Sequence, residues 1–326
     1  MRIGLMGDVM LGRLVNERLR REGPAYVWGD LLPVLAGTDV RFANLECVLA
    51  DGGSPWPGKT FHFRSDSANV ACLEAAGVTV VSLANNHTLD YGLDAFAGML
   101  PLLDTHGILH AGAGRDSAAA REPAVVHAGG TEVGVLAFTD NEPGWAAGPA
   151  SPGVFHVPTD PSDPRTRGLV DLVRRVRAGV GFLLVSAHWG PNWGRAVPPD
   201  HVALAHALVD AGADAVFGHS AHIFRGVEVY RGRPIVYSAG DFIDDYAVDP
   251  TERNDQSFLF LLDVHDGAPA LLRLVPTEIV DFQARRAGAE APAIARRMQQ
   301  RSAALGTEAH WLDEEGCLEI RCNGRG

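Results

Sequence analysis

Short apolar segments, each followed by polar residues, recur along the first two thirds of the chain. Their length and composition predict buried strands, at residues 2–7, 39–43, 77–83, 132–138, 181–187 and 213–217. Segments whose apolar residues have helical spacing lie among them, at residues 11–20, 93–103, 169–176 and 201–209. Strands that alternate with helices predict a mixed α/β sheet.

The pattern changes after residue 222. Strand-like segments then follow one another directly, at residues 226–230, 234–238, 257–264 and 270–275. They predict a second, more antiparallel sheet. One helix is expected from Pro292, in its first turn, to Gly306 as its stop signal. Two sheets with helices outside predict a four-layer α/β/β/α sandwich. We expect a single domain over residues 1–326, with a core at 1–285 and a C-terminal helix and tail at 286–326.

Charge and composition narrow the classes of partner. A formal net charge of -12 argues against nucleic acid and against anionic membranes, because both need a basic surface. No apolar run reaches the length of about 18 residues that predicts a membrane span, and the first residues lack the pattern of a signal peptide. Four cysteines without metal or disulfide spacing suggest free thiols in a reducing compartment. We therefore expect a cytoplasmic protein of undetermined oligomeric state.

Metal-competent side chains come at the ends of successive apolar segments: Asp8, Glu46, Asn86, His87, His188, His219 and His222. The carboxyl ends of strands in an open α/β sheet meet in one crevice, so these residues are expected to converge. Carboxylates, an amide oxygen and imidazoles form a mixed ligand set that suits divalent Mn, Fe or Zn, and a water-rich version suits Ca. The sequence predicts a metal site and leaves the metal open.

Seven motifs in order and spacing resemble the capsule-synthesis protein A (CapA, poly-γ-glutamate biosynthesis) family, a branch of the calcineurin-like metallophosphatases. They are GDVMLGR (7–13), ANLECVL (43–49), SLANNHTLDYG (82–92), AGAGRD (111–116), SAHWGPNW (186–193), GHSAHIF (218–224) and YSAGDFIDDY (237–246). The resemblance covers about residues 1–285. It implies a calcineurin-like metallophosphoesterase fold.

The resemblance also implies roles for individual residues. The metal ligands would be Asp8, Glu46, Asn86, His188, His219 and His222. His87 would be the acid/base that meets the leaving group, oriented by Asp90. Apart from the resemblance, Asp8 and His222 are acid/base candidates if the reaction needs a base on each face of an α-carbon. A metal-activated water would be the nucleophile or base.

Two departures from the phosphatase pattern weaken one metal position. Met10 stands where a ligand histidine is expected, and His219 and His222 are separated by two residues instead of one. We therefore expect one firm metal position. The sequence supports the fold more strongly than it supports a symmetric pair of metals that would clamp a phosphoryl group.

Basic and aromatic residues near the motifs are candidates for substrate binding: Arg13, Lys59, Arg64, Trp189 and Arg225. The basic members would hold a carboxylate or phosphate, and Trp189 would line the pocket. Three acids that follow the last motif strand, Asp241, Asp244 and Asp245, are candidate hydrogen-bond partners for the histidines, and Asp241 is the best placed.

Four functions are compatible with such a site. The first is metal-dependent hydrolysis of an amide or γ-glutamyl bond in a peptide-like or poly-γ-glutamate-like substrate. The second is a peptide epimerase, with His87 and Asp90 or Asp8 on one face and His222 with Asp241 or Asp244 on the other. The others are phosphoester hydrolysis and a non-catalytic accessory role in capsule polymer synthesis.

Overall fold

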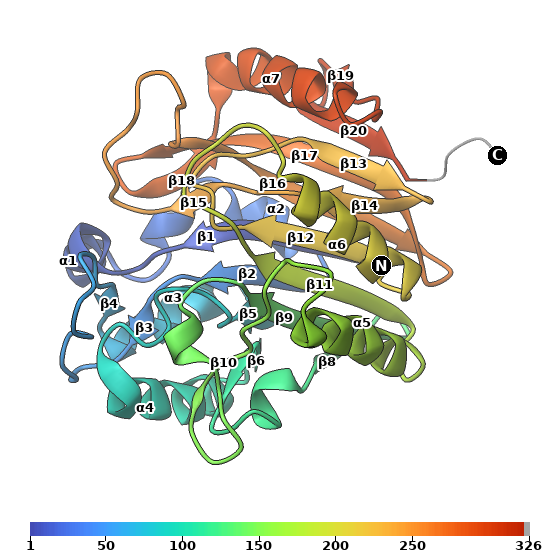
Figure 1. The fold of residues 1–326 in the computed structure, drawn as a ribbon. Coiled ribbons are helices and arrows are strands. Elements are labelled where there is room, and N and C mark those ends of the chain that lie inside the picture. The colour runs from blue at the N-terminus through green and yellow to red at the C-terminus, as the bar shows by residue number, and fades with distance from the viewer. Residues whose placement is uncertain (323–326) are drawn as a thin grey trace.

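Two large β-sheets are stacked face to face in the computed structural model, which describes residues 1–322 (Figure 1). The larger sheet has ten strands in the order β19-β20-β17-β16-β1-β2-β5-β6, with β15 beside β1 and β18 beside β17. Its strands are β1 (Arg2–Val9), β2 (Val40–Leu45), β5 (Val80–Ser82), β6 (Leu109–Ala111), β15 (Asp241–Ile243), β16 (Gln256–His265), β17 (Ala268–Val280), β18 (Gln283–Arg286), β19 (His310–Leu312) and β20 (Cys317–Arg321).

The second sheet has six strands in the order β13-β14-β12-β11-β9-β8. They are β8 (Ala124–Ala128), β9 (Thr131–Thr139), β11 (Phe182–His188), β12 (Ala215–His219), β13 (Val227–Tyr230) and β14 (Arg233–Val236). The four inner strands are parallel and the edge strands β8 and β13 are antiparallel to their neighbours. Strand β11 is buried at every residue, as expected for a parallel strand covered on both faces.

Aromatic side chains fill the space between the two sheets. Phe217 of β12 makes edge-on contacts with Phe42 of β2, at 5.8 Å between ring centroids, and with Phe260 of β16, at 5.5 Å. All three side chains are fully buried. Edge-to-face aromatic pairs add to the stabilisation that burial of their apolar area provides. They hold the two strand layers at a fixed relative position.

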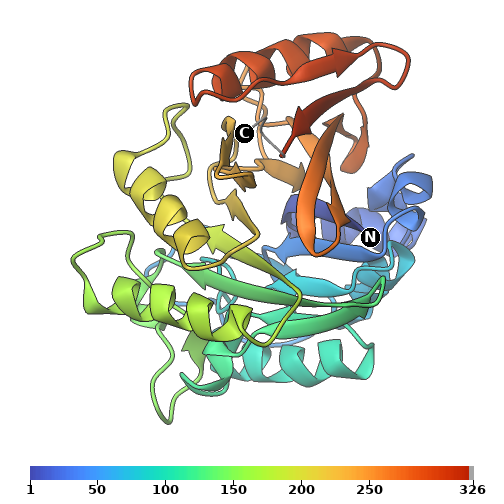
Figure 2. The same cartoon turned by 90° about the vertical axis from the view of Figure 1, so that its right-hand side faces the viewer.

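Helices cover the outer faces of both sheets. The apolar cluster on the larger sheet includes residues of α1 (Arg13–Glu22), α2 (Leu32–Ala36), α3 (Val70–Ala75) and α4 (Gly92–Thr105). The smaller sheet packs against α5 (Pro164–Arg177) and α6 (Pro199–Asp210). Figure 2 shows α5 and α6, in light green and yellow, on the side of the strands opposite the blue N-terminal helices.

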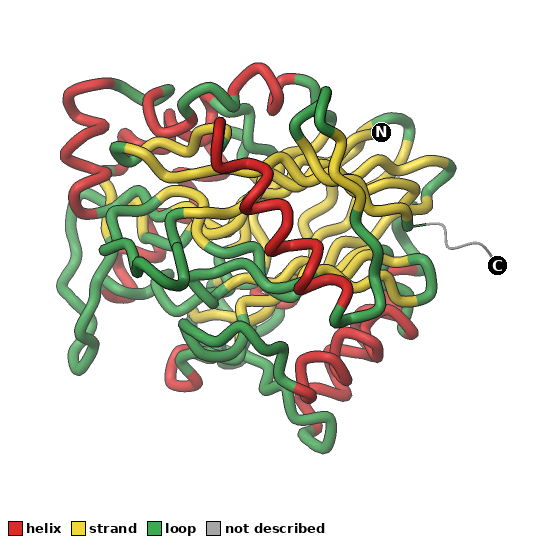
Figure 3. Tube along the Cα trace, turned by 90° about the horizontal axis from the view of Figure 1, so that it is seen from above, coloured by secondary structure: helices red, strands yellow, loops and turns green. Residues whose placement is uncertain are grey.

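The C-terminal helix α7 (Ala291–Ala303) contacts β13 of one sheet and β17, β19 and β20 of the other. It therefore closes one edge of the sandwich, and the view from above shows it crossing the strands (Figure 3). The shorter elements are β3 (Val48–Leu49), β4 (Arg64–Ser65), β7 (Ala113–Gly114), β10 (Gly153–Val154), η1 (Tyr26–Trp28), η2 (Ser67–Asn69), η3 (Ala119–Arg121), η4 (Pro143–Trp145) and η5 (Gly288–Glu290).

The predicted layered α/β fold is confirmed, but the expected division of the sheets at residue 222 is wrong. Strands β13 and β14 extend the sheet of β12, whereas β16 pairs with β1. Strands β19 and β20 lie in the region predicted as helix and tail. Apolar patterning reports which residues are buried and leaves the pairing partner undetermined.

Candidate functional site

The carboxyl ends of strands from both sheets meet at one edge of the sandwich. In the larger sheet Asp8 of β1 lies opposite Asn44 of β2 and opposite Asp241 of β15. In the smaller sheet His188 of β11 lies opposite His219 of β12. The two sheets bring these pairs together, since His219 Nδ1 is 3.5 Å from Asp8 Oδ1. The predicted convergence of acids and imidazoles is thus present in the structure.

One group of potential metal ligands consists of Asp8, His188 and His219, whose ligand atoms lie within 4.8 Å of one another. The Nδ1 atoms of His188 and His219 are 2.8 Å apart. Asn86 adds its side-chain oxygen, 2.8 Å from His188 Nε2. Ser186 orients His219 through a contact of 2.7 Å to Nε2.

A second group consists of Asp8, His222 and Asp241, again within 4.8 Å. His222 Nδ1 is 2.9 Å from Asp241 Oδ1. Met10 contributes nothing to the group, because its sulfur accepts a hydrogen bond from Gly12 N at 3.0 Å in the buried turn. Asp8 belongs to both groups. The sequence led us to expect one firm position, whereas the structure contains two adjacent sets of ligand atoms.

The carboxylates at this edge are buried without enough positive charge around them. Asp8, Glu46, Asp241 and Asp244 are each at most 4% exposed. Burial, followed by the charge of Asp8 and Asp241, raises the pKa of Glu46, and burial raises the pKa of Asp8 to about 6. Within residues 1–322, Glu46 Oε2 and Asp241 Oδ2 have no hydrogen-bond partner. Uncompensated buried charge is costly, so a divalent cation fits this donor set.

The histidines of both groups are held in their neutral form. Burial lowers the pKa of His188 and of His222, and it lowers the pKa of His219 to about 3. Neutral imidazole is the form that ligates a metal, because its lone pair is available. The histidines and carboxylates are therefore a suitable ligand set near neutral pH.

His87 lies beside these groups and belongs to neither. Its Nδ1 is 2.5 Å from Asp90 Oδ2, and its Nε2 is 3.9 Å from Glu46 Oε1. Its ring stacks on Phe63 at 3.9 Å between centroids. Burial lowers the pKa of His87 to about 4. The Asp90 carboxylate accepts a hydrogen bond from Nδ1, which leaves the lone pair of Nε2 facing the Glu46 carboxylate.

Protein contacts occupy the ammonium group of Lys59, which was expected to bind substrate. Lys59 Nζ is 2.7 Å from Asp90 Oδ1 and donates to the carbonyl of Asn86. It also lies 4.4 Å from the ring centroid of Trp145. These contacts give Lys59 a role in fixing Asp90 and the loop that carries Asn86.

Two of the other predicted substrate contacts, Arg13 and Arg64, lie near the surface around the site. Arg13 lies at the rim, 3.2 Å from Asp245 and 5.7 Å above the Phe63 ring. Arg64 donates to the Gly52 carbonyl at 3.3 Å and lies over the ring of Tyr91. Asp245 thus pairs with Arg13 instead of a histidine.

Two expectations about substrate contacts need correction. Trp189 is fully buried and stacks on His201 within the outer core of the smaller sheet. Arg225 is 1% exposed and donates from Nε to the Gly194 carbonyl at 3.0 Å. Both side chains pack inside the protein, so neither is available to a substrate. Trp193, in contrast, is 44% exposed and its ring lies 5.7 Å from that of His222.

Sequence reasoning missed three residues that shape the site. Asn44 donates to Asp8 Oδ1 at 2.7 Å, and Asn85 donates to Asn44 Oδ1 at 3.0 Å. The hydroxyl of Tyr246 is buried without a hydrogen-bond partner in the described part of the chain, and its ring lies 4.9 Å from that of His222. A polar residue such as Asn44 inside an apolar segment was the available signal.

Comparison with known proteins identifies the family. The sequence profile of the bacterial capsule synthesis protein PGA_cap matches residues 2–246. The chain belongs to this family. The matched region includes every residue of both groups, from Asp8 to Asp241. The resemblance to CapA proteins is confirmed.

Relatives of this PGA_cap chain cover most of its length. A probable polyglutamine synthesis accessory protein of Mycobacterium tuberculosis is 35% identical over 94% of the chain and 88% of its own length. The capsule biosynthesis protein CapA of Bacillus anthracis is 29% identical over 98% of the chain and 77% of its own length.

A crystal structure of a hypothetical protein from Thermus thermophilus is similar in fold. It matches with a TM-score of 0.52 and 18% identity, over 85% of this chain and 99% of its own. At this identity the likeness concerns the fold alone.

Among residues 1–322, no helix has the length and apolar character needed to cross a membrane.

Proposed function

We propose that this PGA_cap chain is a metal-dependent enzyme that hydrolyses an amide bond, such as a γ-glutamyl bond, in a peptide-like, carboxylate-rich substrate. The observation that carries the proposal is the position of His87. Asp90 holds its Nδ1 at 2.5 Å, and its Nε2 faces Glu46 at 3.9 Å, beside both ligand groups. An oriented acid/base next to a candidate metal site is the arrangement that amide hydrolysis requires.

The residues that would hold metal are Asp8, Glu46, Asn86, His188, His219, His222 and Asp241. Mn, Fe, Zn and Ca remain the candidates. A divalent cation bound there would polarise the substrate carbonyl and lower the pKa of water.

His87 would move the proton in the reaction. Its neutral Nε2 accepts a proton from the attacking water while the C–O bond forms. It then returns that proton to the departing amine nitrogen as the C–N bond breaks. Asp90 keeps Nδ1 protonated throughout, and Lys59 at 2.7 Å keeps Asp90 in place. Arg13, with a side chain 40% exposed at the rim, is the candidate contact for a substrate carboxylate.

A second candidate function is peptide epimerisation, favoured by the second histidine–aspartate pair. His222 and Asp241 stand 2.9 Å apart, and with His87 and Asp90 they would provide a base for each face of an α-carbon. An accessory role in polymer synthesis is supported by the name of the mycobacterial relative. Phosphoester hydrolysis is the fourth candidate that shares these residues.

One set of assays separates the four candidates. Protein stripped with a chelator and reloaded with Mn²⁺ is incubated with γ-glutamyl oligomers in D₂O and, separately, with a phosphoester. Metal-dependent release of amine that H87A lacks supports the proposal. Deuterium at the α-carbon without cleavage indicates an epimerase, and phosphate release alone indicates a phosphoesterase. Metal binding without any of these reactions overturns the enzyme proposal in favour of the accessory role.

The cellular compartment in which the protein acts is also part of the proposal. The cysteines Cys47, Cys72, Cys317 and Cys322 are all unpaired and buried. Unpaired thiols suit a reducing environment. We propose that the chain acts in the cytoplasm on a small or polymeric anionic substrate.

A further inference from the structure

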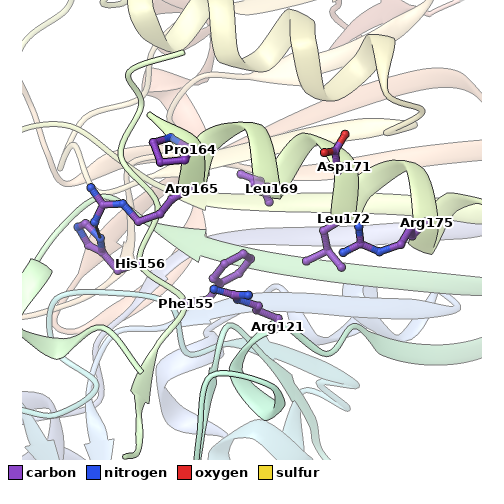
Figure 4. Close-up of a pocket in the computed structure, with 10 residues that line it drawn as sticks. Arg121, Phe155, His156, Pro164, Arg165, Leu169, Asp171, Leu172 and Arg175 are labelled. Carbon is purple, nitrogen blue, oxygen red and sulfur yellow. Dashed lines mark hydrogen bonds between the residues drawn. The ribbon is translucent and has the colours of Figure 1, made fainter. Parts of the chain in front are cut away.

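A groove with a volume of about 340 Å³ lies against α5 on the outside of the smaller sheet (Figure 4). Its apolar lining comes from Phe155, Leu169 and Leu172. Three arginines stand around it: Arg121 from η3, and Arg165 and Arg175 from α5. The guanidinium of Arg121 lies 5.5 Å from the ring centroid of Phe155. The groove thus combines an apolar floor with a basic rim.

The positive charge of this groove is largely unpaired. Asp171 is the acid in the groove lining, and it already forms an ion pair at 2.6 Å with Arg174, which lies outside the groove. Arg165 pairs with Asp163 at 2.7 Å. Across residues 1–322, Arg121 and Arg175 form no ion pair with a carboxylate. In a chain of net charge -12, two unpaired arginines beside a cavity point to an anionic ligand.

One end of the groove, at His156, lies two contacts away from His188 at the carboxyl end of β11. His156, which lines the groove, contacts the carbonyl of Asp140 through Nε2 at 3.2 Å. The backbone N–H of Asp140 donates to the carbonyl of His188 at 3.3 Å. Helix α5 begins at this end, at Pro164, and the groove follows it to Arg175. That distance is roughly 16 Å at a helical rise of about 1.5 Å per residue.

We propose that this groove binds the carboxylate-rich chain of the substrate beyond the bond held at the metal site. The inference rests on the proposed function for the nature of the substrate. A polypeptide with acidic side groups offers methylene stems to the apolar floor and carboxylates to the arginine rim. The groove, roughly 16 Å long, takes only a short stretch of such a chain, because a γ-linked residue is longer along its backbone than an α-linked one.

Binding of labelled γ-glutamyl oligomers, followed by fluorescence anisotropy, tests the groove directly. Oligomers of about three and about ten residues are compared on the full chain, both stripped with a chelator and loaded with Mn²⁺. We expect the longer oligomer to bind about tenfold tighter, which corresponds to about 1.4 kcal/mol. The gain should vanish in R121E/R175E and at 1 M NaCl, where screening acts over about 3 Å.

The matched control is R21E/R167E, which makes the same change in net charge on exposed arginines outside the groove that form no ion pair with a carboxylate within residues 1–322. It should keep the gain, and so should the variant R121K/R175K at least in part. A gain that persists in R121E/R175E, or one that R21E/R167E removes equally, contradicts binding in the groove. Equal binding of a fully amidated long oligomer overturns it as well.

The two proposals fail in different ways. If the short oligomer is hydrolysed but the long one binds no tighter, the groove is wrong and the enzyme stands. If neither the wild type nor any variant hydrolyses either oligomer, the hydrolase proposal is wrong. The groove proposal still holds in that case if the tighter binding of the longer oligomer depends on Arg121 and Arg175. Circular dichroism of R121E/R175E confirms that loss of the gain comes from a folded protein.

Discussion

His222 Nδ1 and Asp241 Oδ1 lie 2.9 Å apart, although the two residues are separated by 19 positions in the chain. Asp241 reaches this place because β15 pairs with β1 in parallel and sets Asp241 opposite Asp8. The pair completes a second group of ligand atoms where Met10 offers no imidazole.

Replacing Asp241 tests this second group. In D241N one carboxylate of the group of Asp8, His222 and Asp241 becomes a neutral amide, so we expect Mn²⁺ affinity to fall by about 10- to 100-fold. Calorimetric titration and elemental analysis of the dialysed protein measure the change. D245N is the matched control, since Asp245 pairs with Arg13. Equal metal content in D241N and D245N would contradict a ligand role for Asp241.

Replacing His87 separates acid/base chemistry from metal binding. His87 lies beside the ligand groups and contacts Asp90 through Nδ1, so H87A should retain its metal and lose about 10²-fold in turnover. D90N should reduce turnover too, because the amide no longer fixes the same tautomer. Turnover and metal content are measured on the same preparation. Loss of metal from H87A in proportion to activity would instead make His87 a ligand.

Removing metal should destabilise the protein. Glu46 is 1% exposed among other carboxylates, and burial with their charge raises its pKa. At a metal concentration about 100 times Kd, we expect a stabilisation of about 2.7 kcal/mol relative to chelated protein. The chelated E46Q variant should melt above the chelated wild type, because the amide removes the cost of burying an acid among other carboxylates, and should gain less from added Mn²⁺. Differential scanning calorimetry measures both effects.

His201 predicts a pH dependence of stability that is independent of the metal site. It is 2% exposed and stacks on Trp189, and burial lowers its pKa from 6.5 to about 4. Between these two values the unfolded chain binds more protons than the folded one, so this contribution to stability falls as pH falls. At pH 5 the loss is about 2 kcal/mol relative to pH 7.5.

Urea unfolding of the wild type and H201N, at both pH values, isolates this contribution. The other histidines are common to both proteins, so their titration cancels in the difference. H201N should lose less stability than the wild type on acidification. An equal loss in both proteins would show that His201 does not control the difference.

The chain by itself determined the local features of the site. Each apolar segment predicted a strand, and the polar residue after it marked a carboxyl end, as at Asp8, His188 and His219. These patterns are local because burial of a strand depends on its own alternating or continuous apolar residues. The succession of motifs was also sufficient to recognise the family that the profile confirms.

Tertiary structure decided which segments became neighbours. Only strand pairing placed β16 beside β1 and Asp241 beside His222, and only packing buried Trp189 and Arg225 away from the site. The physical reason is that apolar patterning measures the tendency of a segment to leave water, which is non-directional. The choice of partner comes from register and side-chain packing across segments far apart in the chain.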